Sequence, residues 1–397
     1  MHEPGIIQSF FLIFSGAALL AAAALFARQP FLIAYIALGA LLGPHGIAWV
    51  ENPALLEEIA EIGIIFLLFL VGLDLRPSRL RNMLGESLLT GLVTTSVFFG
   101  IGLGTMLAFG FTLPEALITG VAVSFSSTIM GIKLLPTTVL HHRHIGEMVV
   151  SLLLIQDLLA VIALLVLAGV GGGATGQGDA IAGLGTRLGL ALGTLPLLGA
   201  LAWAGVRWLL VPLLQRFDAF TEFVFLLAIG WCLGLASLAQ AAGLSLEIGA
   251  LIAGVSLAAT PVAAYIVDNL KPLRDFFLVL FFFGVGAELN GALVLEVWLP
   301  TLLLGTALVL AKPPTFALAL RAQGESSGAS WEVGARLGQA SEFSLLVSYV
   351  AGAAALIGAE AAHVIQGATV FTLIVNTYLV IFRYPSPIAP VARLRRD

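Results

Sequence analysis

Two polar residues interrupt one of the most apolar stretches of the chain. Gln156 and Asp157 lie near the middle of a long apolar run that includes Ser151–Ala160 (SLLLIQDLLA). A carboxylate at the centre of a membrane-spanning helix costs roughly 3 kcal/mol or more, so such residues are functional by default. One acid in an otherwise apolar helix can carry a proton or a cation. We therefore predict that Asp157 is the centre of a site for these ions.

Two further segments combine polar side chains with apolar surroundings. Four of the five residues Ser124–Thr128 (SFSST) carry hydroxyls, and Gly338–Ser344 (GQASEFS) repeats this polarity later in the chain. Hydroxyls offer the backbone partners that compete with helical hydrogen bonds. In hydrocarbon an irregular backbone is tolerated only where it lines a cavity or is buried in protein. Both segments predict broken helices near the middle of the membrane.

Three more charges lie in or near apolar runs. Lys312 ends the run Leu308–Lys312 (LVLAK) just before two prolines, so it either enters the bundle or reaches the membrane surface. Glu342 lies in the second polar segment, as a cation ligand or as the partner of Arg336 or Lys312. Asp157 could instead be a structural partner of one of these two bases. We expect all three charges to support the site.

The composition decides the class of protein. Of the 397 residues, 59% are hydrophobic and 10% are charged, and the mean hydropathy is +1.06. Soluble domains average about 25% charged residues, so a cytosolic enzyme, a nucleic-acid binder and a disordered chain are excluded. Barrel strands alternate in polarity and are less apolar. We predict an all-α polytopic membrane protein that contacts the lipid bilayer, binds no nucleic acid, needs no cofactor and is not an enzyme.

Apolar segments of helix length fill most of the chain. Divided at charges, prolines and glycine clusters, it gives about thirteen candidate spans of about 20 residues each. They start near Ile6, Phe31, Leu55, Gly85, Pro114, Glu147, Leu188, Thr221, Leu244, Pro272, Ala292, Trp331 and His363. The glycine-rich stretch Gly171–Thr186 predicts a flexible loop. The whole chain, residues 1–397, is then one transmembrane transport domain.

Basic residues predict the orientation. Most of the 18 Lys and Arg residues, Lys271 and Arg274 among them, fall in loops on the side of the C-terminal tail, whereas the loops on the other side hold Arg187. Cytoplasmic loops carry the excess of positive charge. We predict an N-terminus outside, a C-terminus in the cytoplasm and a location in the inner (cytoplasmic) membrane.

Two pairs of segments resemble each other at a nearly constant distance. Phe69–Leu75 (FLVGLDL) is similar to Phe283–Leu289 (FGVGAEL), 214 residues later, and Leu38–Gly43 (LGALLG) is similar to Ile248–Ala253 (IGALIA), 210 residues later. The distance corresponds to seven predicted spans, an odd number, so the second copy is inverted. Inverted repeats of about 1–170 and 221–385, joined by a linker helix of about 188–214, are typical of secondary transporters.

Together these segments resemble a known family. The residues that carry the resemblance are Gly43–Gly46 (GPHG), Phe69–Asp74, Ser126–Thr128, Gln156–Asp157, Gly243–Gly254 (GLSLEIGALIAG) and Ser341–Phe343. Their order and spacing are similar to those of the monovalent cation:proton antiporter-2 family, and most of all to its Kef-type potassium/proton branch. The resemblance covers nearly the whole chain.

The resemblance implies a sodium/proton antiporter-like fold and a homodimer, with two crossed broken helices in a mobile core domain of each protomer. It implies that Asp157 binds the monovalent cation and the proton. Gln156 takes the place of Asn or Asp in sodium-type relatives, and Ser126, Ser127 and Thr128 complete the site. Lys312 resembles the lysine that pairs with the acid. Kef-type proteins usually continue into a cytoplasmic nucleotide-binding regulatory domain, and we expect this domain either to be absent here or to have been cut away from this chain.

We therefore expect a secondary antiporter that exchanges a monovalent cation, with K⁺ favoured and Na⁺ possible, for H⁺. Two alternatives stay open at this stage. One is a ligand-gated potassium efflux channel, which would pass current without coupled proton movement. The other is a sodium-coupled solute symporter, which would need a larger polar cavity than one acid and a few hydroxyls suggest.

Overall fold

The computed structural model describes the chain apart from residues 1–5, 51–52, 75–85, 137–143, 172–193, 195, 218–219, 243, 259, 261–262, 390–393 and 396–397. Most of the predicted loop at 171–186 and the first residues of the predicted linker helix lie outside the described part. So do several of the basic loop residues, namely Arg76, Arg79, Arg81, Arg143, Arg187, Arg393 and Arg396.

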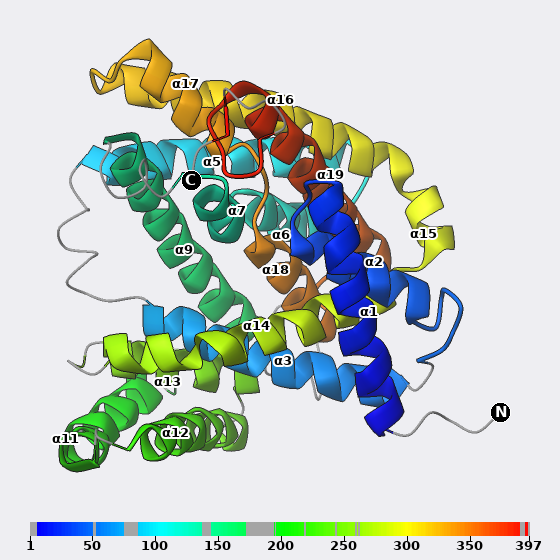
Figure 1. Cartoon of the computed structure of the whole chain (residues 1–397). Helices are drawn as coiled ribbons and strands as arrows, with labels where there is room; N and C mark the ends of the chain where they lie inside the picture. Colours follow the sequence, from blue (N-terminus) through cyan, green and yellow to red (C-terminus); the bar gives the residue numbers. More distant parts are fainter. Residues whose placement is uncertain are drawn as a thin grey trace.

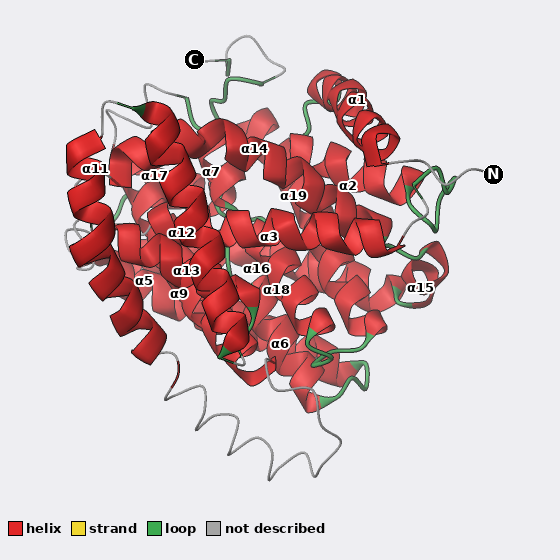
Figure 2. Cartoon of the chain, turned by 90° about the horizontal axis from the view of Figure 1, so that it is seen from below, coloured by secondary structure: helices red, strands yellow, loops and turns green. Residues whose placement is uncertain are grey.

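Helices make up the architecture, and the described residues form no strand beyond one isolated bridge between Ser386 and Arg395 (Figure 2). The helices are α1 (Ile6–Phe26), α2 (Phe31–Leu42), α3 (Pro53–Asp74), α5 (Glu86–Ala108), α6 (Leu113–Val123), α7 (Thr128–Lys133), α9 (His144–Gly171), the π-helical turn η1 (Val206–Leu210), α11 (Val211–Phe217), α12 (Thr221–Ala241), α13 (Leu246–Ala258), α14 (Ala263–Ala287), α15 (Gly291–Glu296), α16 (Trp298–Ala322), α17 (Ser327–Arg336), α18 (Glu342–Ala353) and α19 (Ala359–Arg383).

Seven helices in the described residues are long and apolar enough to cross a membrane. They include α1, α9, α12, α16 and α19, and several shorter apolar helices, such as α2, α6, α13 and α18, lie among them. Helices satisfy their own backbone groups, which is what hydrocarbon requires. The predicted all-α, multi-pass membrane fold is confirmed, while the count of thirteen spans stays a prediction.

The helices form two groups (Figure 1). In the first group, α3 packs on α13 and α14, and α14 packs on α2; α1 and α12 join them. In the second group, α16 packs on α5, α17 and α19, while α18 packs on α6, α9 and α19. In Figure 1, α3, α12, α13 and α14 of the first group lie in the lower half of the picture, and α5, α16 and α17 of the second lie in the upper half. α9, which packs mainly on helices of the second group, runs obliquely from the upper part toward the lower.

Glycines set the close approach of helices within the first group. A Cβ on Gly39 of α2 would overlap the carbonyl oxygen of Phe283 in α14, and one on Gly286 would overlap the carbonyl oxygen of Ile36. The backbones of α2 and α14 therefore touch at a spacing that only glycine allows.

The same contact recurs between α3 and α13. Here Gly254 faces the carbonyl oxygen of Phe69, and Gly72 faces that of Leu251. Gly286 follows Gly72 by 214 residues, and Gly254 follows Gly39 by 215 residues. The contacts therefore repeat at distances of 214 and 215 residues, in agreement with the predicted distance of 214. The sequence similarity at 210 residues pairs Gly39 with Gly249, whereas the contacts pair it with Gly254.

Three features of the helices differ from the prediction. α14 begins at Ala263 rather than near Pro272, and α16 begins at Trp298, after the short α15, rather than near Ala292. α16 also continues through Pro313 and Pro314. Prolines are tolerated in membrane helices because neighbouring helices and side chains satisfy the freed backbone groups. Tight packing of α14 on α2 and α3 outweighs the local tendency of a proline to end a helix.

Two helices are broken at the polar segments, as the sequence predicts. α6 ends at Val123 and α7 begins at Thr128, while α17 ends at Arg336 and α18 begins at Glu342. The first halves end 213 residues apart and the second halves begin 214 residues apart. The two breaks thus occupy corresponding places in the chain, and both belong to the second group of helices.

Candidate functional site

The two breaks cross and hold each other through hydroxyls. Ser126 Oγ donates to the carbonyl oxygen of Leu337 at 2.8 Å, and Ser344 Oγ donates to that of Ala122 at 2.6 Å. A helix end leaves carbonyls without intrahelical partners, and in a membrane protein these must be satisfied by other protein groups. The serines of one break therefore satisfy the carbonyls of the other.

Lys312 lies at this crossing. Its Nζ donates to the carbonyl oxygens of Phe125 at 2.6 Å and Gln339 at 3.1 Å, and the residue is 0% exposed. Both carbonyls follow the C-terminal end of a half-helix, where the helix dipole is negative and a cation is stabilising. The ring of Phe98 lies 4.9 Å from the ammonium. Lys312 is thus inside the bundle, and it directs its ammonium to the two breaks rather than forming the expected ion pair with Asp157.

Two amides complete the crossing and were not singled out from the sequence. Gln339 Nε2 donates to the carbonyl oxygen of Ser127 at 3.4 Å. Asn376 of α19 donates to Gln339 Oε1 and, at 3.0 Å, to the carbonyl oxygen of Ala335. Buried amides of this kind fix a network in one arrangement because each unsatisfied group is costly. For Asn376, the signal available in the sequence was a polar side chain within the largely apolar helix α19.

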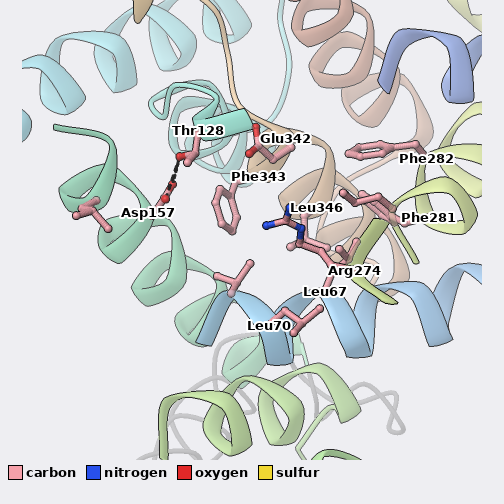
Figure 3. A pocket seen from close by; sticks show the side chains of 13 residues that line it. Leu67, Leu70, Thr128, Asp157, Arg274, Phe281, Phe282, Glu342, Phe343 and Leu346 are labelled. Carbon is pink, nitrogen blue, oxygen red and sulfur yellow. Dashed lines mark hydrogen bonds between the residues drawn. The ribbon is translucent and has the colours of Figure 1, made fainter. Parts of the chain in front are cut away.

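Asp157 lies beside the first break. Thr128, the first residue of α7, directs its hydroxyl to both carboxylate oxygens, with Oγ1 at 3.0 Å from Oδ1 and 2.9 Å from Oδ2 (Figure 3). Asp157 is half-buried on α9. A hydrogen bond to an ionised carboxylate is stronger than one between neutral groups. Thr128 and Asp157 therefore form the core of the candidate site.

The other three predicted ligands lie behind this pair. Ser126 N–H donates to Gln156 Oε1 at 3.0 Å, and Gln156 is 0% exposed. Ser127 Oγ accepts a hydrogen bond from Met130 N at 3.1 Å and so caps α7. Within the described part of the chain, Gln156 Nε2 has no hydrogen-bond partner. These side chains support the break, whereas Asp157 and Thr128 face open space.

That space is a cavity between the two groups of helices (Figure 3). It holds about 840 Å³ not filled by protein atoms, its open mouth included. Four of its lining residues are polar: Thr128, Asp157, Glu342 and Arg274. The apolar lining comes from α3, α9, α14 and α18, namely Leu67, Leu70, Val71, Leu154, Leu278, Phe281, Phe282, Phe343 and Leu346. The cavity brings Glu342 to the same space as Asp157.

Arg336 lies outside this cavity and has other partners. Its Nη2 is 2.7 Å from Glu332 Oε1 and donates to the carbonyl oxygen of Pro385 at 2.8 Å, while Nη1 donates to that of Leu134 at 2.8 Å. It therefore ties α17 to the chain after α7 and to the C-terminal segment. The expected pairing of Arg336 with Glu342 is not what the structure shows. Glu342, the first residue of α18, accepts from Ser341 Oγ at 3.4 Å.

Arg274 is the cavity residue that the sequence prediction places elsewhere. A span that starts at Pro272 leaves Arg274 at the membrane surface, among the cytoplasmic basic residues. On the observed α14 it lies four residues before Leu278 and seven before Phe281, so the three share one helix face. This spacing would have placed Arg274 at the cavity if the helix start had been known.

Comparisons with known proteins bear on this arrangement. The sequence model of the family described as "Sodium/hydrogen exchanger, transmembrane" matches residues 12–382. The chain is 28% identical over 360 residues to K(+) efflux antiporter 4 of Arabidopsis thaliana, covering 89% of this chain and 60% of that protein. It is 29% identical over 365 residues to K(+) efflux antiporter 5 of the same plant, covering 90% and 61%.

A third relative is the iron transporter MagA of Paramagnetospirillum magneticum, 26% identical over 351 residues, covering 88% of this chain and 79% of that protein. The chain thus spans only about 60% of the length of the two plant antiporters. Among solved structures, the sodium proton antiporter MjNhaP1 from Methanocaldococcus jannaschii at pH 8 matches with a TM-score of 0.68 at 16% identity, covering 94% of this chain and 95% of that one.

At this identity the structural match establishes the fold alone, which is the antiporter-like fold that the sequence predicted. The family match spans almost the whole chain and confirms the predicted resemblance to cation:proton antiporters. The chain belongs to the sodium/hydrogen exchanger family of transmembrane transporters.

Proposed function

We propose that this chain is a secondary antiporter that exchanges one monovalent cation, K⁺ in preference to Na⁺, for one proton. The names of the plant relatives, K(+) efflux antiporters, support the choice of K⁺. The observation that carries the proposal is Asp157, a half-buried acid beside a broken helix, whose carboxylate faces a cavity between the two groups of helices.

In this proposal cation and proton share Asp157. The protonated and the cation-bound carboxyl are both neutral, so either form can cross the low-dielectric barrier, whereas the empty anion is held back by the cost of its desolvation. Thr128 serves both charged forms. Its hydroxyl donates to the empty carboxylate and can rotate to offer its oxygen to a bound cation, because a hydroxyl both donates and accepts.

The remaining side chains position the pair. Ser126 and Gln156 fix the break against α9, Ser127 caps α7, and Lys312 donates hydrogen bonds to the carbonyls at the crossing. Backbone carbonyls near the break are the additional oxygen ligands for a cation in this proposal. The Nε2 group of Gln156 is a hydrogen-bond donor and cannot coordinate a cation, so only the amide oxygen of Gln156 could serve as a ligand.

We further propose that the second group of helices moves against the first to expose Asp157 to each side in turn. The repeated glycine contacts of α2–α14 and α3–α13 support inverted repeats of about 1–170 and 221–385 with a linker helix of about 188–214. In the same proposal the chain acts as a homodimer in the inner membrane. Its N-terminus lies outside and its C-terminus in the cytoplasm, where relatives of the Kef type carry a nucleotide-binding domain.

Proton flux in proteoliposomes tests this function. Vesicles containing the full chain carry an imposed pH gradient and a fluorescent pH indicator, and K⁺, Na⁺ or Li⁺ is added with the membrane potential clamped. K⁺ should dissipate the gradient with wild-type protein and not with D157N, which removes the titratable group at nearly the same size. A K⁺ current without proton movement would show the channel alternative to be correct.

A further inference from the structure

Arg274 brings a positive charge into the cavity that holds Asp157 and Glu342. Figure 3 shows its guanidinium extending from α14 into the space in front of the helices that carry the two acids. α14 belongs to the first group of helices, whereas α9 and α18 belong to the second. Arg274 and the two acids therefore lie on different groups of helices.

The ion pair that the structure shows for Arg274 is with its neighbour on the same helix. Its Nε lies 3.6 Å from Asp275 Oδ1, and the side chain of Asp275 is 71% exposed. An ion pair with so exposed a group contributes little. The same Nε makes no hydrogen bond within the described part of the chain. Its guanidinium lines the same cavity as the two acids, so it can act on them across that space.

The charges in the cavity sum to a definite value. With both carboxylates ionised, Asp157, Glu342 and Arg274 together carry one net negative charge. Glu342 is the first residue of a 12-residue helix, where the dipole favours an ionised carboxylate. The other lining residues, apart from Thr128, are apolar, so these charges act on one another more strongly than in water. One proton or one monovalent cation brings the sum of these three charges to zero.

We propose that Arg274 is a specificity-determining residue: a tethered cation that competes with the transported cation for Asp157 and Glu342 and limits the cavity to one single charge. The inference rests on the proposed function and deepens it. A cation that enters the cavity must compete with the guanidinium for the two carboxylates. When the cation leaves, the guanidinium interacts with the carboxylates again. Without Arg274, the two carboxylates would together carry two negative charges. They would then bind a monovalent cation more tightly than the wild type does, and they could also bind a divalent cation.

Three variants of the full chain in proteoliposomes test this. R274Q removes the charge, R274K keeps it, and R207Q removes an exposed arginine from the linker helix, where Arg207 lies over the ring of Trp203, 5.5 Å from its centroid. R274Q should lower the half-maximal K⁺ concentration about tenfold and should make K⁺-driven proton flux sensitive to Ca²⁺. R274K and R207Q should behave like the wild type in both measurements.

A double variant that restores the net charge of the cavity side chains provides a further test. E342Q should weaken the apparent K⁺ affinity, and R274Q/E342Q, which again carries one net negative charge, should return it to near the wild-type value. If R274Q alone does not fold, this double variant carries the test. An unchanged half-maximal concentration in folded R274Q, or R274K behaving like R274Q, would overturn the role of the charge, as would failure of the double variant to restore affinity.

Cation binding separates this inference from the proposed function. The thermal stability of the purified chain in detergent, titrated with K⁺, reports binding without transport. If the wild type binds K⁺ but exchanges no protons, the antiport function is wrong, while tighter K⁺ binding by R274Q still supports the inference. If the wild type exchanges protons and R274Q binds K⁺ no more tightly, the inference alone fails.

Discussion

The hydroxyl oxygen of Thr128 lies 3.0 and 2.9 Å from the two carboxylate oxygens of Asp157. One side chain at the helix break therefore contacts both oxygens to which a cation or a proton would bind. T128A removes this contact, and T128S keeps it. T128A also removes the oxygen that Thr128 offers to a bound cation in the proposed function, and a contact of this kind with a charged group contributes about 1.5–3 kcal/mol, so T128A should raise the half-maximal K⁺ concentration about tenfold or more. T128S should stay within about threefold of the wild type, as measured by proton flux in proteoliposomes. Equal effects of the two variants would show that the hydroxyl is not a part of the site.

Lys312 should stabilise the fold through the carbonyls of Phe125 and Gln339, not through Asp157. K312M leaves those two carbonyls without their donor in the protein interior, and a buried polar group left unsatisfied costs about 1–3 kcal/mol. We expect a lower thermal midpoint for K312M in detergent and a smaller loss for K312R.

The comparison with Asp157 decides between the two roles of the lysine. If Lys312 paired with Asp157, adding D157N to K312M would recover stability, because both charges would then be absent. The structure instead predicts that K312M/D157N is no more stable than K312M alone. Recovery in the double variant would contradict the geometry at the crossing.

The repeated glycine contacts should respond alike to substitution. G39A and G254A each place a methyl group against a backbone carbonyl of the neighbouring helix, so both should destabilise the chain by about 1–3 kcal/mol. A methyl group on Gly234 of α12 would meet no atom within 4 Å, so G234A serves as the matched control. Thermal midpoints and the monodisperse fraction on gel filtration measure the effect. A normal midpoint for either G39A or G254A would show that the two contacts are not equivalent.

The helix breaks and the central acid could be predicted from the sequence because their signals are local. Four hydroxyls in five residues and a carboxylate in an apolar run stand out without knowledge of neighbouring helices. Partner identities could not be predicted, because they depend on how distant helices meet. Lys312 reaches carbonyls 187 and 27 residues away in the chain, and nothing near it in sequence indicates them.

Two errors have definite causes. The local rule that a proline starts a helix points to Pro272, but the packing of α14 overrides that rule, and the misplaced start leaves Arg274 at the membrane surface. The repeat distance of 210 arises because α13 contains two glycines, Gly249 and Gly254, and the residues around Gly249 match α2 better. The contacts instead select Gly254 as the counterpart of Gly39.

Competition between cation and proton at Asp157 is the central claim, and one measurement tests it most directly. The half-maximal K⁺ concentration is determined in proteoliposomes from about pH 6 to about pH 9, a range that brackets buried carboxyl groups, with the membrane potential clamped. Each bound proton removes one cation site. In the pH range where Asp157 is protonated, the apparent K⁺ affinity should therefore weaken about tenfold for each unit by which the pH falls, and at higher pH, where Asp157 is ionised, the affinity should become constant. A half-maximal concentration that stays flat over the whole range would contradict the shared site and favour a channel.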